Sequence, residues 1–89
     1  MISHTTQAFR TMFAQLPAQV QQQAREAYKL FRQNPSHPSL RWKHVHPIKP
    51  IYSVRVGRGY RAVGRRSTDE VIWFWIGSHA DYDQLLSRL

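Results

Sequence analysis

The residues best suited to chemistry lie near the C-terminus, where a strand is expected to end and a helix to begin. The apolar run Val71–Ile76 predicts a buried central strand, and a Gly-Ser pair follows it. Just beyond that pair come one histidine, one tyrosine and two aspartates: His79, Tyr82, Asp81 and Asp83. Backbone N–H donors and side chains can converge on an anion at such a junction.

Two arginines form a second candidate site. A three-residue turn, Gly57–Gly59, would join two strands and set Arg55 directly opposite Arg61. Opposed arginines repel each other, and a phosphate placed between them relieves the repulsion through bidentate contacts. The alternative is a pair of solvated arginines on a polar sheet face. Three more cations belong to the same region: Arg58, Arg65 and Arg66.

The residues at the helix start have structural as well as chemical interpretations. Ser78 is a plausible N-cap and Asp81 stands three residues later, which is a capping-box pattern. His79 can act as an acid or a base near neutral pH. Spacing alone nevertheless favours an exposed helix-start residue for His79 and a packed aromatic for Tyr82.

The charge balance indicates a polyanionic partner. The 89 residues carry 13 Lys+Arg against 5 Asp+Glu, a net charge of +8, and more than half of the cations lie between Arg41 and Arg66. There is no cysteine, so a disulfide framework and a thiolate metal site are both excluded. No apolar run is long enough for a membrane span and the N-terminus lacks signal-peptide features, so a cytoplasmic protein is expected.

Other site types find little support. His44 and His46 share a strand face, and with His37 they could suggest a metal site, but no further ligand has suitable spacing. Gly57–Gly59 has no helix after it, so it is not a phosphate-binding loop of a recognised kind. We therefore expect no metal and no cofactor.

The pattern of elements predicts an α+β domain spanning residues 1–89. Phe9, Met12, Phe13 and Leu16 form one helical stripe with a cap at Thr5 or Thr6, and a second helix runs from Pro17 to about Asn34. These two helices are expected to form a hairpin packed on a small antiparallel sheet of three to four strands. The expected strands and the short last helix cover residues 40–46, 51–56, 60–66, 71–76 and 81–89.

The assembled motifs resemble the RelE/ParE superfamily of type II toxin–antitoxin toxins. The likeness covers roughly residues 6–86 in order, and the closing His-x-x-Tyr-Asp pattern points to the RelE-like branch. Four segments carry the resemblance: Asn34–Leu40, Tyr52–Val56, Gly59–Ala62 and Ile76–Asp83.

The resemblance implies a toxin held by a cognate antitoxin. RelE-like members enter the ribosomal decoding site and cleave mRNA through attack of the ribose 2′-hydroxyl, which needs no metal. By this likeness Arg61 is the phosphate stabiliser, Arg55 a second cation, and His79 and Tyr82 candidates for proton transfer and base stacking. The expected RNA-binding cations are Lys43, Lys49, Arg58, Arg65 and Arg66.

Two departures from the family pattern point to a smaller sheet or a partly competent site, and other functions stay open because family members differ in target. Some relatives carry a lysine where this chain has Ser53, and the usual first strand has only Ile2 and Ser3 available. The alternatives are a ParE-like toxin that inhibits DNA gyrase without catalysis, and an inactive RNA-binding module.

Overall fold

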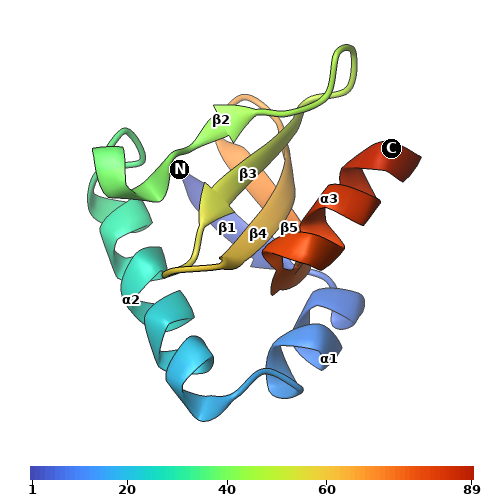
Figure 1. The fold of residues 1–89 in the computed structure, drawn as a ribbon. Coiled ribbons are helices and arrows are strands. Elements are labelled where there is room, and N and C mark those ends of the chain that lie inside the picture. Colours follow the sequence, from blue (N-terminus) through green and yellow to red (C-terminus); the bar gives the residue numbers. More distant parts are fainter.

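The computed structural model describes residues 1–89 as three α-helices on a five-stranded sheet (Figure 1). The chain begins with a strand, continues through two helices and a short 3-10 helix, η1, and ends in four strands and a last helix. In chain order the elements are β1 (Ile2–Thr5), α1 (Gln7–Ala14), α2 (Ala18–Gln33), η1 (Pro38–Leu40), β2 (Lys43–His44), β3 (Ile51–Arg55), β4 (Tyr60–Arg66), β5 (Glu70–Ser78) and α3 (His79–Arg88).

The prediction of three to four antiparallel strands is wrong, because the sheet has five strands and is mixed. Its order is β1-β5-β4-β3-β2, and β1 runs parallel to β5 while the other neighbours are antiparallel. The first strand, which was expected to be missing, is therefore present as β1. Ile2 N–H donates to Asp69 O at 2.8 Å and Thr6 N–H donates to Trp73 O at 3.0 Å. The four residues of β1 are mostly polar and form no ordered strand on their own, so these hydrogen bonds to the edge of β5 stabilise the strand.

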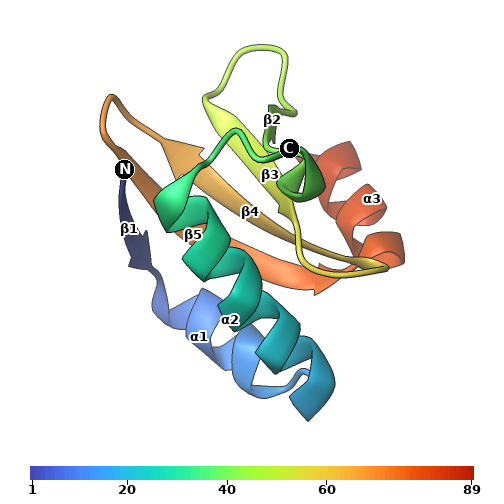
Figure 2. The same cartoon turned by 90° about the vertical axis from the view of Figure 1, so that its left-hand side faces the viewer.

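Both N-terminal helices lie on one face of the sheet, and they fit the expected helical hairpin only roughly. Thr6 caps α1, accepting a hydrogen bond from Phe9 N–H at 3.0 Å, as the sequence predicted. The two helices splay apart as they cross the sheet, so that only their connected ends are close (Figure 1), and both lie on the side of the sheet away from α3 (Figure 2). No helix combines the length and apolar composition that crossing a membrane requires.

The predicted strand over residues 40–46 is mostly a different structure. Residues 38–40 form η1, and Arg41 adopts a left-handed backbone conformation with φ 48°. A strand cannot pass through that conformation, so pairing begins only at Lys43 and lasts two residues. The kink also redirects the chain onto the edge of the sheet.

The core has two parts, one on each face of the sheet. The larger part lies under α1 and α2 and contains Phe31, Leu40, Val54, Val56, Ala62, Val71, Trp73 and Ile76. The smaller part lies under α3 and is formed by Ile51, Val63 and Tyr82. The sheet face that carries the arginine pair is therefore partly covered by the last helix rather than wholly open.

Candidate functional site

The β3–β4 turn places the two arginines as the sequence predicted. Arg55 and Arg61 are cross-strand partners, and Gly57 and Gly59 take positive φ values of 60° and 83°. Directly paired residues point to the same face of a sheet, so the two side chains share the α3 face. The Arg55 Nε–H donates to Gly57 O at 3.2 Å, and the Arg61 Nη1–H donates to Tyr60 O at 2.8 Å.

Arg61 occupies an electrostatic environment that favours an anion. Burial and the charges of Arg55 and Arg41 lower the pKa of Arg61, while Tyr82 and Asp83 act in the opposite direction. A negatively charged group placed between the arginines would offset both the repulsion and the lost solvation. Sequence reasoning missed Arg41, whose charge also acts on Arg61 and whose backbone adopts the left-handed conformation.

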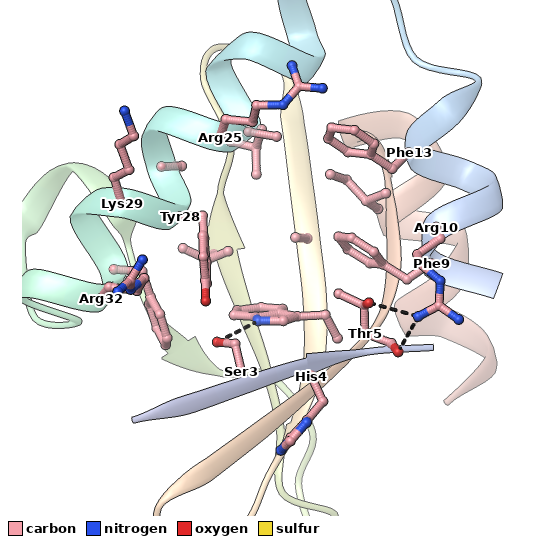
Figure 3. Close-up of a pocket in the computed structure, with 18 residues that line it drawn as sticks. Ser3, His4, Thr5, Phe9, Arg10, Phe13, Arg25, Tyr28, Lys29 and Arg32 are labelled. Carbon is pink, nitrogen blue, oxygen red and sulfur yellow. Dashed lines mark hydrogen bonds between the residues drawn. The ribbon is translucent and has the colours of Figure 1, made fainter. Parts of the chain in front are cut away.

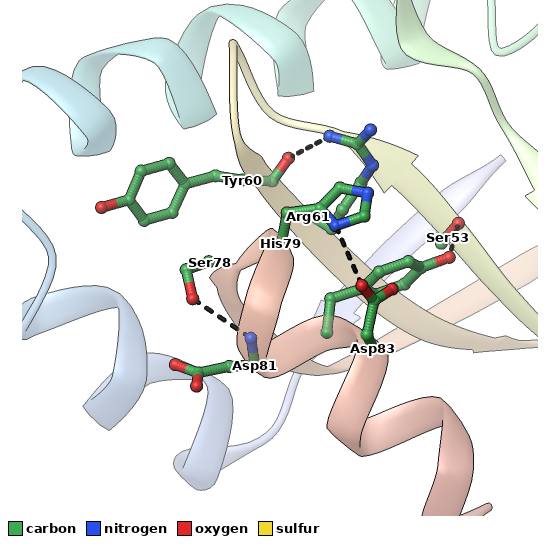
Figure 4. A network of polar contacts seen from close by, with 8 residues as sticks. Ser53, Tyr60, Arg61, Ser78, His79, Asp81 and Asp83 are labelled. Carbon is green, nitrogen blue, oxygen red and sulfur yellow. Dashed lines mark hydrogen bonds and ion pairs between the residues drawn. The ribbon is translucent and has the colours of Figure 1, made fainter.

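The last helix brings a histidine–carboxylate pair to the same place (Figure 4). Ser78 is the N-cap and accepts from Asp81 N–H at 3.2 Å, as expected, but the helix begins at His79 rather than at residue 81. The His79 N–H donates to Gly59 O at 2.8 Å, which ties the start of α3 to the β3–β4 turn. His79 Nδ1 lies 3.4 Å from Asp83 Oδ2, so the carboxylate can accept from Nδ1–H and leave Nε2 as the free nitrogen.

Tyr82 is buried rather than presented to solvent. Its hydroxyl donates to Ser53 Oγ at 3.0 Å, and the two residues are only 5% and 1% exposed. A longer side chain at position 53 would occupy the place of the Tyr82 hydroxyl and break this contact. The geometry supports the packed-aromatic interpretation of Tyr82, with the ring also 5.6 Å from the His79 ring.

The five predicted RNA-binding cations do not all share one face. Lys43 pairs with Ser53 and Arg65 with Ile51, so both lie on the arginine-pair face, while Arg58 is at the turn and Lys49 in the β2–β3 loop. Arg66 instead reaches the other face. Its guanidinium carbon is 5.3 Å from the centre of the Tyr52 ring.

The three histidines considered as metal ligands bond to the backbone or to a neighbouring hydroxyl. His44 Nε2–H donates to Lys49 O at 2.7 Å, and His37 Nδ1 accepts from Ser39. His46 Nδ1 accepts from two backbone N–H groups in the β2–β3 loop. No group of three or more His, Asp or Glu side chains is arranged to hold a metal ion.

A groove of about 960 Å³ opens between α1 and α2 on the opposite face of the sheet (Figure 3). Its floor and walls are mainly apolar and include Phe9, Phe13 and Trp73. Four cations line it: Arg10, Arg25, Lys29 and Arg32. The sequence assigned the helix aromatics to the core. They do pack against it, but the spread of the helices also leaves several of them along the groove.

Comparison with solved structures places the fold. A chain of the RelB-RelE antitoxin-toxin complex from Methanococcus jannaschii superposes with a TM-score of 0.73 at 14% identity, over 92% of this chain and 96% of that chain. YafQ from Escherichia coli superposes with a TM-score of 0.70 at 11% identity, over 90% of this chain and 94% of that chain. The isolated E. coli RelE toxin superposes with a TM-score of 0.65 at 14% identity, over 98% of this chain and 96% of that chain.

A family model identifies the chain more directly. A search of curated proteins finds no match. The model of the ParE-like toxin domain matches residues 18–84, which include α2, the four C-terminal strands and most of α3. This chain belongs to the ParE-like toxin domain family, within the RelE/ParE superfamily of toxin–antitoxin toxins.

Proposed function

We propose that this toxin is a ribosome-dependent mRNA endonuclease that inhibits translation. The observation that carries the proposal is the Arg55–Arg61 pair beside His79 and Asp83. The arginines offer charge for a phosphate that becomes more negative during reaction, and the histidine offers a proton carrier. A protein that only bound DNA gyrase would need neither arrangement.

The reaction would use the RNA's own nucleophile. The ribose 2′-oxygen forms a bond to the adjacent phosphorus while the bond from phosphorus to the 5′-oxygen breaks, leaving a 2′,3′-cyclic phosphate and a 5′-hydroxyl. Arg61 and Arg55 stabilise the crowded phosphoryl oxygens. His79 transfers one of the two protons through Nε2, and water transfers the other: one proton leaves the 2′-hydroxyl and one is delivered to the 5′-oxygen. Asp83 holds the His79 ring in the required tautomer.

We assign Tyr82 a positioning role within this mechanism. Its hydroxyl is committed to Ser53, so it holds α3 on the sheet and thereby places His79 beside the arginines. Arg41, Lys43 and Arg65 contribute positive charge around the site and would contact neighbouring phosphates.

The partner would be a cognate antitoxin with an acidic, amphipathic helix. The groove between α1 and α2 is apolar inside and carries four cations, which complements such a helix in both shape and charge. Charge reversal by Lys29→Glu should weaken antitoxin binding, whereas Arg88→Glu, at an exposed site outside the groove, should not. Equal binding by both variants would place the antitoxin elsewhere.

Inhibition of DNA gyrase remains the second candidate, because the matching family model is that of ParE-like toxins. Primer extension on mRNA after induction of the toxin, with DNA integrity followed in parallel, separates the two functions. We expect discrete mRNA cuts, intact DNA and no cuts with Arg61→Ala. Arg88→Ala serves as the matched control. DNA damage without mRNA cleavage would support the gyrase function instead.

A further inference from the structure

Three aromatic rings form a continuous stack from the core to the surface at the β2 edge. The Trp42 and Tyr52 ring centres are 4.8 Å apart, and those of Tyr52 and His44 are 5.0 Å apart. The interplanar angles are 26° and 17°, so both contacts are stacked. At its inner end, Trp42 meets the buried rings of Phe31 and Trp73 edge-on, at 4.9 Å and 5.8 Å.

The backbone holds this stack in place. Trp42 and His44 are two residues apart, so they point to the same side of the chain, and His44 is the cross-strand partner of Tyr52. The His44 ring is fixed further by its Nε2–H, which donates to Lys49 O at 2.7 Å. Its Nδ1 is then the acceptor nitrogen of a neutral ring.

The stack ends in solvent. β2 is the outermost strand of the sheet, His44 is exposed, and Tyr52 is its single ring partner. Core packing accounts for Trp42, which contacts the buried rings, but not for an immobilised ring at the exposed end. A flat ring that is held rigidly and left open is what an additional planar group requires, because little side-chain entropy is lost on stacking.

The charges around the exposed ring indicate which planar group it would take. Lys49 is exposed in the loop whose backbone oxygen accepts from the His44 ring, and the Arg66 guanidinium lies against Tyr52. Aromatic platforms flanked by cations are the means by which proteins hold single-stranded nucleic acid. We propose that His44 is the outer ring of a stacking site for one nucleobase of a single-stranded RNA.

This site would belong to the same RNA strand that the arginine pair holds, and to that extent the inference rests on the proposed function. Tyr52 precedes Arg55 by three residues of β3, a separation of about 10 Å along the strand. Lys43 lies on the outermost strand, on the face that carries the arginine pair, and so stands between the His44 ring and Arg55. An RNA strand leaving Arg55 could therefore cross the edge at Lys43 and set a flanking base on His44.

Binding of uncleavable RNA tests the site without requiring catalysis. The probes are short 2′-O-methyl oligonucleotides with 2-aminopurine at successive positions, added to the purified chain at low ionic strength. We expect one position to lose fluorescence strongly on binding. His44→Ala should abolish that quenching and weaken binding roughly 5- to 100-fold, the loss produced by removing one stacked ring. His44→Phe should retain the quenching and the affinity. The control is His4→Ala, which removes an exposed histidine on the opposite edge strand and should change neither the quenching nor the affinity.

Far-UV circular dichroism of each variant checks that it is folded. A second test needs no variant: a 5-iodouridine oligonucleotide is crosslinked by ultraviolet light to the unsubstituted chain. Crosslinks should map to His44 or Tyr52. Undiminished quenching with His44→Ala, or crosslinks confined to other surfaces, would overturn the inference. The inference would also be overturned if His44→Ala lost antitoxin binding but kept RNA binding, because His44 would then be a protein contact. A chain that quenches the probe but never cleaves mRNA would refute the proposed function and leave the stacking site standing.

Discussion

Replacing Tyr82 by phenylalanine should reveal whether this residue positions α3 or takes part in the reaction. The change removes one oxygen and leaves the ring in its buried place. Ser53 Oγ, 1% exposed, then loses the hydroxyl that donates to it at 3.0 Å. An unsatisfied buried polar group costs about 1–3 kcal/mol, and in a domain of this size each 1 kcal/mol lowers the Tm by about 4–8 °C.

We therefore expect Tyr82→Phe to lower the Tm by roughly 4–24 °C, for a loss of about 1–3 kcal/mol in the free energy of unfolding. Ser53→Ala should destabilise similarly, and the double variant should lose less than the sum, because neither orphaned hydroxyl remains. Thermal melts followed by circular dichroism measure all three.

The cleavage assay completes this test. At a temperature where the variant is folded, Tyr82→Phe should cleave mRNA within a few-fold of the unsubstituted rate. A Tm that does not change, combined with a large loss of cleavage, would refute the reasoning, because the hydroxyl would then be a reacting group rather than a structural one.

The remaining predictions concern the proton carrier and the sheet. His79→Gln should reduce cleavage about 10²-fold or more while ribosome and antitoxin binding persist; an unchanged rate would move proton transfer to another group. Asp83→Asn should lower the cleavage rate less than His79→Gln and leave substrate affinity unchanged, and an equal loss of affinity would make Asp83 a binding residue. Gly64→Ala should destabilise by about 1–3 kcal/mol in a denaturant titration, because a Cβ there would lie 2.6 Å from Val71 Cγ2 and 3.0 Å from Trp73 Cε3; full stability would show that the β4–β5 bulge absorbs the methyl group.

Local signals in the sequence predicted the parts of the site that local physics controls. The Gly57–Gly59 turn fixed the register that opposes Arg55 and Arg61, and Thr6 and Ser78 cap the helices that they were expected to cap. In each case the deciding interaction lies within a few residues of chain, so composition and spacing contain the information.

The features that the sequence did not predict depend on contacts between distant segments. β1 is a strand because the edge of β5 is available to it, and β2 is short because Arg41 turns into the left-handed region. The Tyr82–Ser53 contact joins residues 29 positions apart and covers a face that alternation alone marked as polar. The groove likewise follows from the angle between α1 and α2, which no local pattern specifies.

The most direct test of the central claim is the chemistry of the product ends. The purified toxin is mixed with ribosomes programmed with a defined mRNA, and the fragments are analysed for their terminal groups. Attack by the 2′-hydroxyl predicts a 2′,3′-cyclic phosphate and a 5′-hydroxyl, no cleavage when the ribose at the cut site is 2′-deoxy, and no cleavage by Arg61→Ala. Fragments with a 5′-phosphate, or cleavage that survives the deoxy substitution, would contradict the mechanism, and intact mRNA together with inhibited gyrase would contradict the function.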